Sequence, residues 1–167
     1  MNRQGFALRQ FIPDDLPQVI EINRTCLPEN YNSMFFLDIH RNFPEAFVVA
    51  EVNGKVVGYI MCRLEHGFSE MRRFSLVKKG HIVSVAVLPE YRRTGMGKAL
   101  VAEALKAISK HKGEECFLEV RATNDSAVNL YKKLGFSITR KVSRYYFDGA
   151  DAYVMSIKIL QDSGSAD

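Results

Sequence analysis

Hydrophobic residues alternate with polar ones in some parts of the chain and recur every three or four positions in others. Alternating or β-branched runs predict strands, and apolar stripes at helical spacing predict helices. The runs that predict strands are residues 6–12, 47–52, 56–64, 81–88, 116–121, 136–143 and 152–159. Four apolar stripes predict helices. The first follows Pro13, the second contains Phe35, Ile39 and Phe43, the third extends from Leu100 to Ile108, and the fourth extends from Ala127 to Leu134.

The order of these elements predicts an α/β fold. One strand, two helices, three strands, a helix, a strand, a helix and two strands are typical of a mixed sheet with helices on both faces and a βαβ unit in its middle. Asn53-Gly54, between two strand runs, predicts a two-residue hairpin. The polar and basic segment 67–79 is expected to be a flexible excursion. One domain is expected over residues 1–160, followed by a flexible C-terminal tail at 161–167.

The composition is ordinary for a soluble, enzyme-sized domain. With 167 residues, of which 47% are hydrophobic and 25% charged, the chain can bury one core without disulfides. No stretch approaches the roughly 20 apolar residues that span a bilayer, and the first residues lack the apolar core of a signal peptide. Cys26, Cys62 and Cys116 are widely spaced in apolar segments and indicate buried thiols in a reducing compartment. We therefore expect a cytoplasmic protein that does not contact membranes.

The net charge of +4 favours an acidic partner only weakly. The basic residues occur as separated pairs, whereas a nucleic-acid module more often shows a continuous basic stripe with interleaved aromatic residues. A solvated surface explains most of these pairs, and a phosphate-bearing cofactor could explain one or two. No specific nucleic-acid partner is expected.

The segment from Arg92 to Gly97 carries the clearest chemical signal. It joins a predicted strand to a predicted helix and contains two arginines and two glycines. The first N–H groups of a helix lack internal acceptors and lie at the positive end of its dipole, and glycines let a diphosphate reach them. Leu100 replaces the third glycine of a dinucleotide fingerprint, and Ala99 replaces the Ser or Thr of a P-loop. The segment predicts a phosphate-binding helix start, with a plain helix start as the alternative.

Two motifs in this order resemble the acetyl-CoA motifs of the GNAT superfamily of N-acetyltransferases. Arg92 to Gly97 is similar to the family's pyrophosphate signature, and Asn124 to Phe136 is similar to its second motif. The likeness covers residues 6–160. It implies the GNAT fold, which is a mixed, mostly antiparallel central sheet of about seven strands with four helices on both faces.

The resemblance also implies acetyl-CoA as the cofactor and assigns residues to it. The main chains of Val85 and Val87 would bind the pantetheine arm, which Asn124 would also contact. Tyr131 would lie beside the thioester sulfur and protonate the departing thiolate, although an aromatic residue at this helical spacing could also only pack. The positions assigned to the cofactor are Val83, Ser84, Val85, Val87, Tyr91, Arg92, Arg93, Thr94, Gly95, Met96, Gly97, Lys98, Asn124, Tyr131, Lys132 and Lys133.

Three further segments resemble the archaeal NatA-type (arrest-defective) branch of the family, whose RimI-type cousins share the same cofactor motifs. They are Leu27 to Tyr31, Gly80 to Val87 and Tyr145 to Tyr153. Phe147 and Ala150 depart from the branch, which usually has Ala and Glu at these turn positions.

The NatA-type likeness implies that the peptide entrance is lined by Glu29, Tyr31, Tyr145 and Tyr146. Glu29 would fix or deprotonate the incoming amine, directly or through water. Alternatives remain for each residue by itself: a solvated loop acid for Glu29 and a surface sheet edge for the tyrosines.

His81 and Glu119 form a second group of candidate catalytic residues. Each is polar on a predicted core strand, where an unpaired polar group is costly. If the two strands are parallel neighbours, these side chains could meet near the acetyl site and relay the amine proton through water. A structural His–Glu hydrogen bond is the equally weighted alternative. A divalent ion held by this pair is a less favoured one, and no metal site is predicted.

Together these features predict an acetyl-CoA-dependent N-alpha-acetyltransferase that modifies the N-terminal α-amino groups of proteins. An α-amine has a pKa of about 8, against about 10.4 for lysine, so direct attack on the thioester needs no strong base. Substrates with small first residues (Ser, Ala, Thr, Gly) are expected, and peptides that begin with Met are a further candidate substrate. A lysine, polyamine or other small-amine acetyltransferase and a non-catalytic acetyl-CoA-binding module are the alternatives. A ribosomal partner is compatible with the resemblance, and a monomer or weak homodimer is expected.

Overall fold

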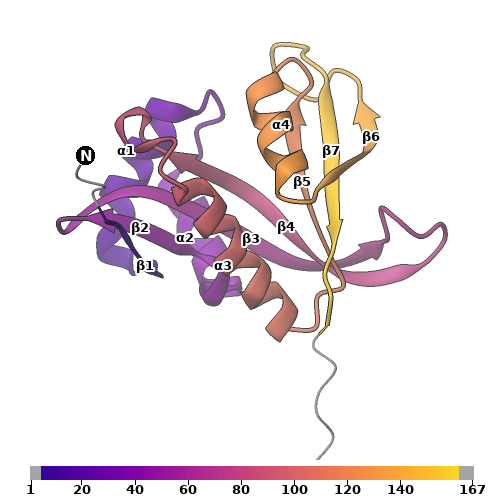
Figure 1. Ribbon diagram of the computed structural model, residues 1–167, viewed down its shortest axis with the longest axis horizontal. Helices are drawn as coiled ribbons and strands as arrows, with labels where there is room; N and C mark the ends of the chain where they lie inside the picture. The colour runs from indigo at the N-terminus through magenta and orange to yellow at the C-terminus, as the bar shows by residue number, and fades with distance from the viewer. Residues whose placement is uncertain (1–4, 162–167) are drawn as a thin grey trace, which may run out of the picture. The chain divides into compact units, whose positions relative to one another are not determined.

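The computed structural model describes residues 5–161, so the predicted tail lies outside the described residues after Gln161. The described residues form seven strands and four α-helices in the predicted order (Figure 1). The elements are β1 Ala7–Gln10, α1 Leu16–Cys26, α2 Ser33–Asn42, β2 Val48–Val52, β3 Lys55–Phe68, β4 Leu76–Val87, α3 Met96–Lys110, β5 Glu115–Arg121, α4 Asp125–Lys133, β6 Ser137–Val142 and β7 Ala152–Lys158.

The strands form one sheet in the order β1-β2-β3-β4-β5-β7-β6. The pairs β1/β2, β2/β3, β5/β7 and β6/β7 are antiparallel, and β4/β5 is parallel. The predicted mixed, mostly antiparallel sheet is therefore confirmed. Contacts within the chain divide the molecule into two compact units. Unit 1 comprises Met1–Arg63 with Ile82–Ala107, and unit 2 comprises Leu64–His81 with Ile108–Asp167. The single-domain expectation stays a prediction.

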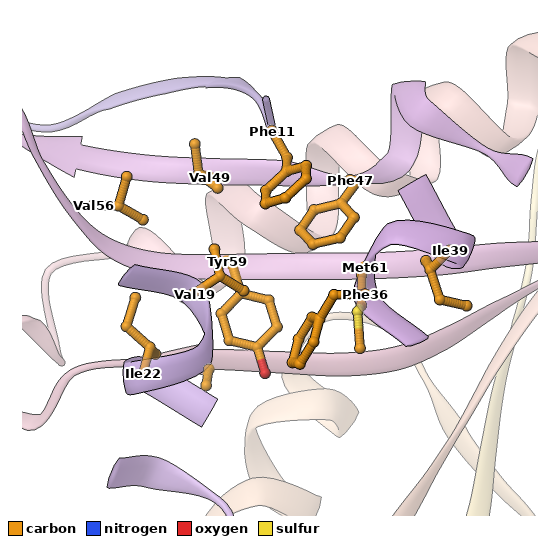
Figure 2. Packing of buried hydrophobic residues seen from close by; sticks show 11 residues of the cluster. Phe11, Val19, Ile22, Phe36, Ile39, Phe47, Val49, Val56, Tyr59 and Met61 are labelled. Carbon is orange, nitrogen blue, oxygen red and sulfur yellow. The ribbon is translucent and has the colours of Figure 1, made fainter. Parts of the chain in front are cut away.

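The core of unit 1 forms where α1 and α2 pack against the first strands (Figure 2). The rings of Phe11 and Phe47 stack with their centroids 4.0 Å apart, and Tyr59 from β3 lies fully buried in the same cluster. Asn53 and Gly54 both have positive φ (50° and 79°), which is the backbone of the predicted tight hairpin between β2 and β3.

The inner face of α2 differs in one position from the predicted stripe. Ile39 and Phe43 are buried as expected, but Phe36 is fully buried and Phe35 is only partly so. Phe35 instead stacks on Tyr31, with ring centroids 4.6 Å apart. Local spacing could not distinguish the two phenylalanines, because the choice depends on the loop before the helix.

The segment predicted as a flexible excursion is strand at both of its ends, so that prediction is partly wrong. β3 continues to Phe68 and β4 begins at Leu76, which leaves a short turn at the end of the long hairpin (Figure 1). The segment makes buried polar contacts: the Lys79 ammonium donates to the Phe68 carbonyl at 2.8 Å, and the Glu70 amide donates to the Glu115 carboxylate of β5 at 2.9 Å. The polar pattern suggested solvent because these partners are distant in sequence.

In unit 2, α4 follows the N-cap predicted at Asn124, whose side-chain oxygen accepts from the Ala127 amide at 3.2 Å. The predicted buried face is partly wrong. Tyr131 is partly buried, but Leu130 is 41% exposed and Val128 is buried instead. Residues three apart share a helix face, so Val128 and Tyr131 define the inner side of this short helix.

Candidate active site

The start of α3 in unit 1 has the geometry expected of a phosphate-binding turn. A 3₁₀ turn at Pro89–Tyr91 follows β4, and the chain then passes through positive φ at Arg93 (62°) and Gly95 (83°). Ala99 makes the first helical bond, from its amide to the Gly95 carbonyl at 3.0 Å. The amides of residues 96–98 precede that bond, so the helix itself offers them no acceptor, and they lie at the positive end of its dipole.

The space beside these amides is open within unit 1. A Cβ built at Gly95 or at Gly97 meets no other atom within 4 Å. Arg92, Arg93 and Lys98 are exposed around the turn, so cationic side chains surround the main-chain donors. The open space, the donors and the charge fit a diphosphate such as that of coenzyme A.

Side chains inside the turn hold its shape. The Arg92 Nε donates to the Val87 carbonyl at 2.8 Å, and the Thr94 hydroxyl donates to the Tyr91 carbonyl at 2.7 Å. Met96 is 2% exposed, so its side chain belongs to the core. Of the residues assigned to the cofactor, Met96 can therefore contribute only its main chain.

The end of β4 presents main-chain groups at the edge away from β3. The Leu88 amide donates to the Val57 carbonyl of β3 at 2.9 Å. Successive residues of a strand direct their N–H and C=O groups to opposite edges, so Val87 and Val85 direct theirs to the other edge. The parallel ladder with β5 comprises only Lys79–His81 and Glu115–Phe117. The edge at Val85 and Val87 is thus where the predicted pantetheine contacts would form.

Val83 and Ser84 precede this edge, and they differ in burial. Val83 is partly buried, whereas Ser84 is 6% exposed and its hydroxyl lies 2.6 Å from that of Tyr59. The Ser84 side chain is therefore engaged in the core. Glu29 and Tyr31, in the loop after α1, are both partly buried.

In unit 2, His81 and Glu119 meet as the parallel strand order predicts. The His81 Nε2 lies 2.7 Å from a carboxylate oxygen of Glu119. His81 pairs with Phe117 in the ladder, which places Glu119 two residues further along the same face. The His81 ring stacks on Phe117 at 4.3 Å and 8°. A carboxylate accepts a hydrogen bond from Nε2–H, and in that tautomer Nδ1 is the unprotonated nitrogen of the ring.

Three charged residues beside this pair were not predicted as functional. Lys79 lies over the Phe117 ring at 4.5 Å and 3.4 Å from Glu70. Arg140 donates to both carboxylate oxygens of Glu70, from Nε at 3.0 Å and Nη2 at 3.2 Å. Burial alone would raise the pKa of Glu70, but these hydrogen bonds hold it below its ordinary value. Glu70 and Arg140 are 70 residues apart, so no local pattern could have paired them.

Tyr131 and the other predicted cofactor residues of unit 2 belong to α4. Burial raises the pKa of Tyr131 to about 12, so its phenol is protonated at physiological pH. The Asn124 side-chain oxygen caps the helix, and its main-chain N–H and C=O bond to Arg121 and Val128, so its side-chain amide nitrogen is the group that could contact a ligand. Lys132 and Lys133 are exposed in the last turn, where cations complement the helix dipole.

The tyrosines before β7 lie in a well-bonded loop of unit 2. The rings of Tyr145 and Tyr146 meet edge to face at 4.9 Å. The Arg121 guanidinium lies 4.3 Å from the Tyr146 ring and donates to Asp148 at 2.9 Å. Tyr145 remains 46% exposed, so it can contact a substrate at the surface.

Residues 5–161 contain no group of three or more His, Cys, Asp or Glu side chains that could hold a metal ion. In the same part of the chain, no helix is long and apolar enough to cross a membrane.

Comparison with known proteins gave consistent matches. The sequence model of the acetyltransferase (GNAT) family matches residues 16–136. A protein of Sulfurisphaera tokodaii named N-alpha-acetyltransferase is 52% identical over 153 residues, which cover 90% of this chain and 92% of that protein. The crystal structure of Ard1 from Thermoplasma volcanium has a TM-score of 0.82 at 36% identity and covers 93% of this chain and 99% of that one. Chaetomium thermophilum Naa20, solved in complex with a bisubstrate analogue, has a TM-score of 0.81 at 34% identity, with 92% of this chain and 86% of that one covered.

Proposed function

The chain belongs to the acetyltransferase (GNAT) family, and from this we propose that it transfers an acetyl group from acetyl-CoA to the N-terminal α-amino group of proteins. The family predicted from the two sequence motifs is thereby confirmed. A relative at 52% identity carries the name N-alpha-acetyltransferase, and the match extends over nine-tenths of both chains. The observation in the structure that best supports the proposal is the open, glycine-containing start of α3 with its main-chain donors.

Acetyl-CoA supplies the activated thioester carbonyl, and the chain supplies the groups that hold it. The amides of residues 96–98, with Arg92 and Arg93, would bind the diphosphate. The main chains of Val85 and Val87 would bind the pantetheine arm, and an N–H near Val85 would polarise the thioester carbonyl. In unit 2, the residues proposed to contact the cofactor are Asn124, Tyr131, Lys132 and Lys133.

The acceptor amine needs little activation. An α-amine with a pKa of about 8 is already neutral in roughly a tenth of molecules near pH 7, whereas lysine at about 10.4 is not. Glu29 is proposed to fix the amine or take its proton, with Tyr31 beside it in unit 1. His81 and Glu119 are proposed to relay the amine proton, since the carboxylate orients the ring and leaves Nδ1 as the base.

Tyr131 is proposed to act as a hydrogen-bond donor to the departing sulfur. Its pKa of about 12 is well above the value of about 8.5 of an ordinary thiol. Complete proton transfer from this phenol to a thiolate would therefore be unfavourable. A hydrogen bond from a protonated phenol still stabilises the developing negative charge. The proton that the thiolate finally receives would come from the amine relay.

The first residue of the substrate, the cellular location and the oligomeric state are proposals that rest on the resemblance to the family. Small first residues (Ser, Ala, Thr, Gly) are proposed as substrates, with Tyr145 and Tyr146 contacting the peptide. A cytoplasmic location is proposed because the thiols of Cys62 and Cys116 are buried, as expected for cysteines of a protein from a reducing compartment. Ribosome association and a monomeric or weakly dimeric state stay predictions.

An acetylation assay on peptides with different first residues tests this function. Peptides that begin with Ser or Ala should be acetylated, while free lysine and spermidine should not react. Turnover of lysine or spermidine alone would favour a small-amine acetyltransferase. Tight acetyl-CoA binding without turnover on any amine would favour a non-catalytic binding module.

A further inference from the structure

Asn23 is a fully buried amide on α1 whose bonds all lie within unit 1. Its side chain belongs to a residue that is only 1% exposed, where an unsatisfied amide would be costly. Its Nδ2 donates to the Glu29 carbonyl at 3.1 Å and to the Tyr59 hydroxyl oxygen at 3.2 Å. Its Oδ1 accepts from the Tyr31 amide at 3.3 Å. Both donor positions of one amide are therefore used.

The bonds to the loop go to main-chain atoms. Asn23 binds the carbonyl of Glu29 and the amide of Tyr31, which are the residues directly before and after Asn30. The loop has only six residues between the end of α1 at Cys26 and the start of α2 at Ser33. Two bonds to so short a segment fix where the Cα atoms of residues 29 and 31 lie, and hence where their side chains begin.

The same amide is connected to β4 through a tyrosine. Tyr59 is fully buried, with its hydroxyl oxygen drawn red in Figure 2, and that oxygen lies 2.6 Å from the Ser84 hydroxyl. The Tyr59 oxygen accepts from Asn23 and also shares a hydrogen bond with the Ser84 hydroxyl, for which the Tyr59 proton is one of the two available donors. Burial raises the pKa of Tyr59 to about 12, so this proton is present throughout the physiological range. The hydrogen bonds thus run from Asn23 to Tyr59 to Ser84.

We propose that Asn23 is a positioning residue for the peptide substrate, which holds Glu29 and Tyr31 in a fixed place relative to the β4 segment that contains Ser84. Ser84 lies between Val83 and Val85, in the strand whose edge is proposed to bind the pantetheine arm. The loop proposed to receive the amine and the strand proposed to hold the thioester therefore share one buried hydrogen-bonded frame. This inference rests on the proposed function, since it assigns the loop to the peptide.

Asn23→Asp is the sharpest test because it keeps the shape and removes both N–H donors. The new carboxylate oxygens would face the Glu29 carbonyl and the Tyr59 oxygen. We expect the peptide KM to rise about ten- to a hundredfold, more than kcat falls. The dissociation constant of acetyl-CoA should change less than about twofold, because no contact of Asn23 involves the phosphate turn.

Tyr59→Phe and Ser84→Ala extend the test in case the aspartate variant folds poorly. Each removes one hydroxyl further along the same chain of bonds, so the rise in peptide KM should be smaller and should decrease in that order. Amide hydrogen exchange gives a readout that does not depend on activity. The Tyr31 amide should exchange faster in Asn23→Asp, because repulsion between the new carboxylate and the Glu29 carbonyl should displace the oxygen that accepts from this amide.

Gln18→Glu is a matched control on the same helix. The Gln18 side chain accepts from the Val56 amide of β3 at 3.0 Å, so this hydrogen bond goes to a strand and not to the loop that contains Glu29 and Tyr31. This substitution should leave the peptide KM and the exchange of the Tyr31 amide unchanged. An equal rise in peptide KM in the control would show that α1 acts only through general stability, which would overturn the proposal.

Three further outcomes separate this inference from the proposed function. Unchanged exchange of the Tyr31 amide in Asn23→Asp would overturn the positioning role, even if the parent protein acetylates peptides. Faster exchange with an unchanged peptide KM would contradict the assignment of Glu29 and Tyr31 to the peptide site. Failure of the parent protein on every peptide would refute the proposed function itself.

Discussion

The start of α3 in unit 1 and the His81–Glu119 pair in unit 2 are two candidate regions built in opposite ways. The first consists of consecutive residues whose main chain is shaped by positive φ at Arg93 and Gly95. The second joins side chains 38 residues apart through a parallel ladder. A contiguous main-chain site can be predicted from composition and spacing. A pair of side chains from two strands can be predicted only on the condition that the strands are neighbours, which the sequence does not show.

The contiguous site should be the more sensitive of the two to a single substitution. Gly97→Glu would place a carboxylate where the diphosphate is proposed to lie, so acetyl-CoA affinity should fall more than about a hundredfold. Isothermal calorimetry measures this loss. Gly97→Ala is the matched variant: its Cβ meets no protein atom within 4 Å, so the fold should be kept or gain up to about 1 kcal/mol in stability.

The alanine variant should nevertheless bind acetyl-CoA more weakly, because the added methyl group occupies the ligand's side of the turn. Opposite changes in stability and affinity would confirm that Gly97 serves the ligand and not the helix. Unchanged affinity in both Gly97 variants would contradict the phosphate assignment. Gly95 is a poorer choice for this test, because its φ of 83° strains any other residue.

The side-chain pair should affect turnover and not cofactor binding. His81→Gln keeps a hydrogen-bond donor toward Glu119 but removes the basic nitrogen. We expect kcat on a good peptide to fall by about a hundredfold, the usual contribution of a general base, with acetyl-CoA affinity unchanged. Steady-state kinetics and calorimetry measure the two quantities. A variant with normal kcat and a lowered melting temperature would show that the pair is only structural.

Substitution of Glu29 should have a smaller effect than substitution in the phosphate turn, which also belongs to unit 1. Glu29→Gln keeps the shape of the side chain and removes its charge, so peptide acetylation should slow by about tenfold. Acetyl-CoA affinity should be unaffected, because Glu29 is not part of the phosphate turn. Turnover equal to that of the parent protein at pH 7 would remove Glu29 from the mechanism.

The smallest expected effect concerns the stability of the network beside the His81–Glu119 pair. Glu70 has a folded pKa below its unfolded value of about 4.5, so the stability it contributes is present above that pH and is lost as pH falls through the lower folded pKa. Denaturant unfolding of Glu70→Gln should show a loss of about 1–2 kcal/mol at pH 7. The difference from the parent should shrink below pH 4.5. A constant difference from pH 7 to pH 3 would contradict the ionised state of Glu70.

Much of the fold could be predicted because its signals are local. The Asn53-Gly54 hairpin, the cap at Asn124 and the order of the elements follow from dihedral preference, capping chemistry and periodicity over short windows. The segment around Lys79 failed for the opposite reason. Its charges suggested solvent, but the Lys79 ammonium is buried against Glu70, nine residues earlier, and against the ring of Phe117 on β5.

By itself, then, the sequence determined the element order, the glycine-containing turn before α3 and the family to which the chain belongs. Only the tertiary structure decided that Phe36 and not Phe35 is buried, that Arg140 pairs with Glu70, and that Asn23 holds the loop with Glu29 and Tyr31. The physical reason is range. Backbone dihedrals and helix ends are governed by neighbouring residues, whereas the burial and pairing of a polar side chain depend on atoms that the chain brings together only after it has folded.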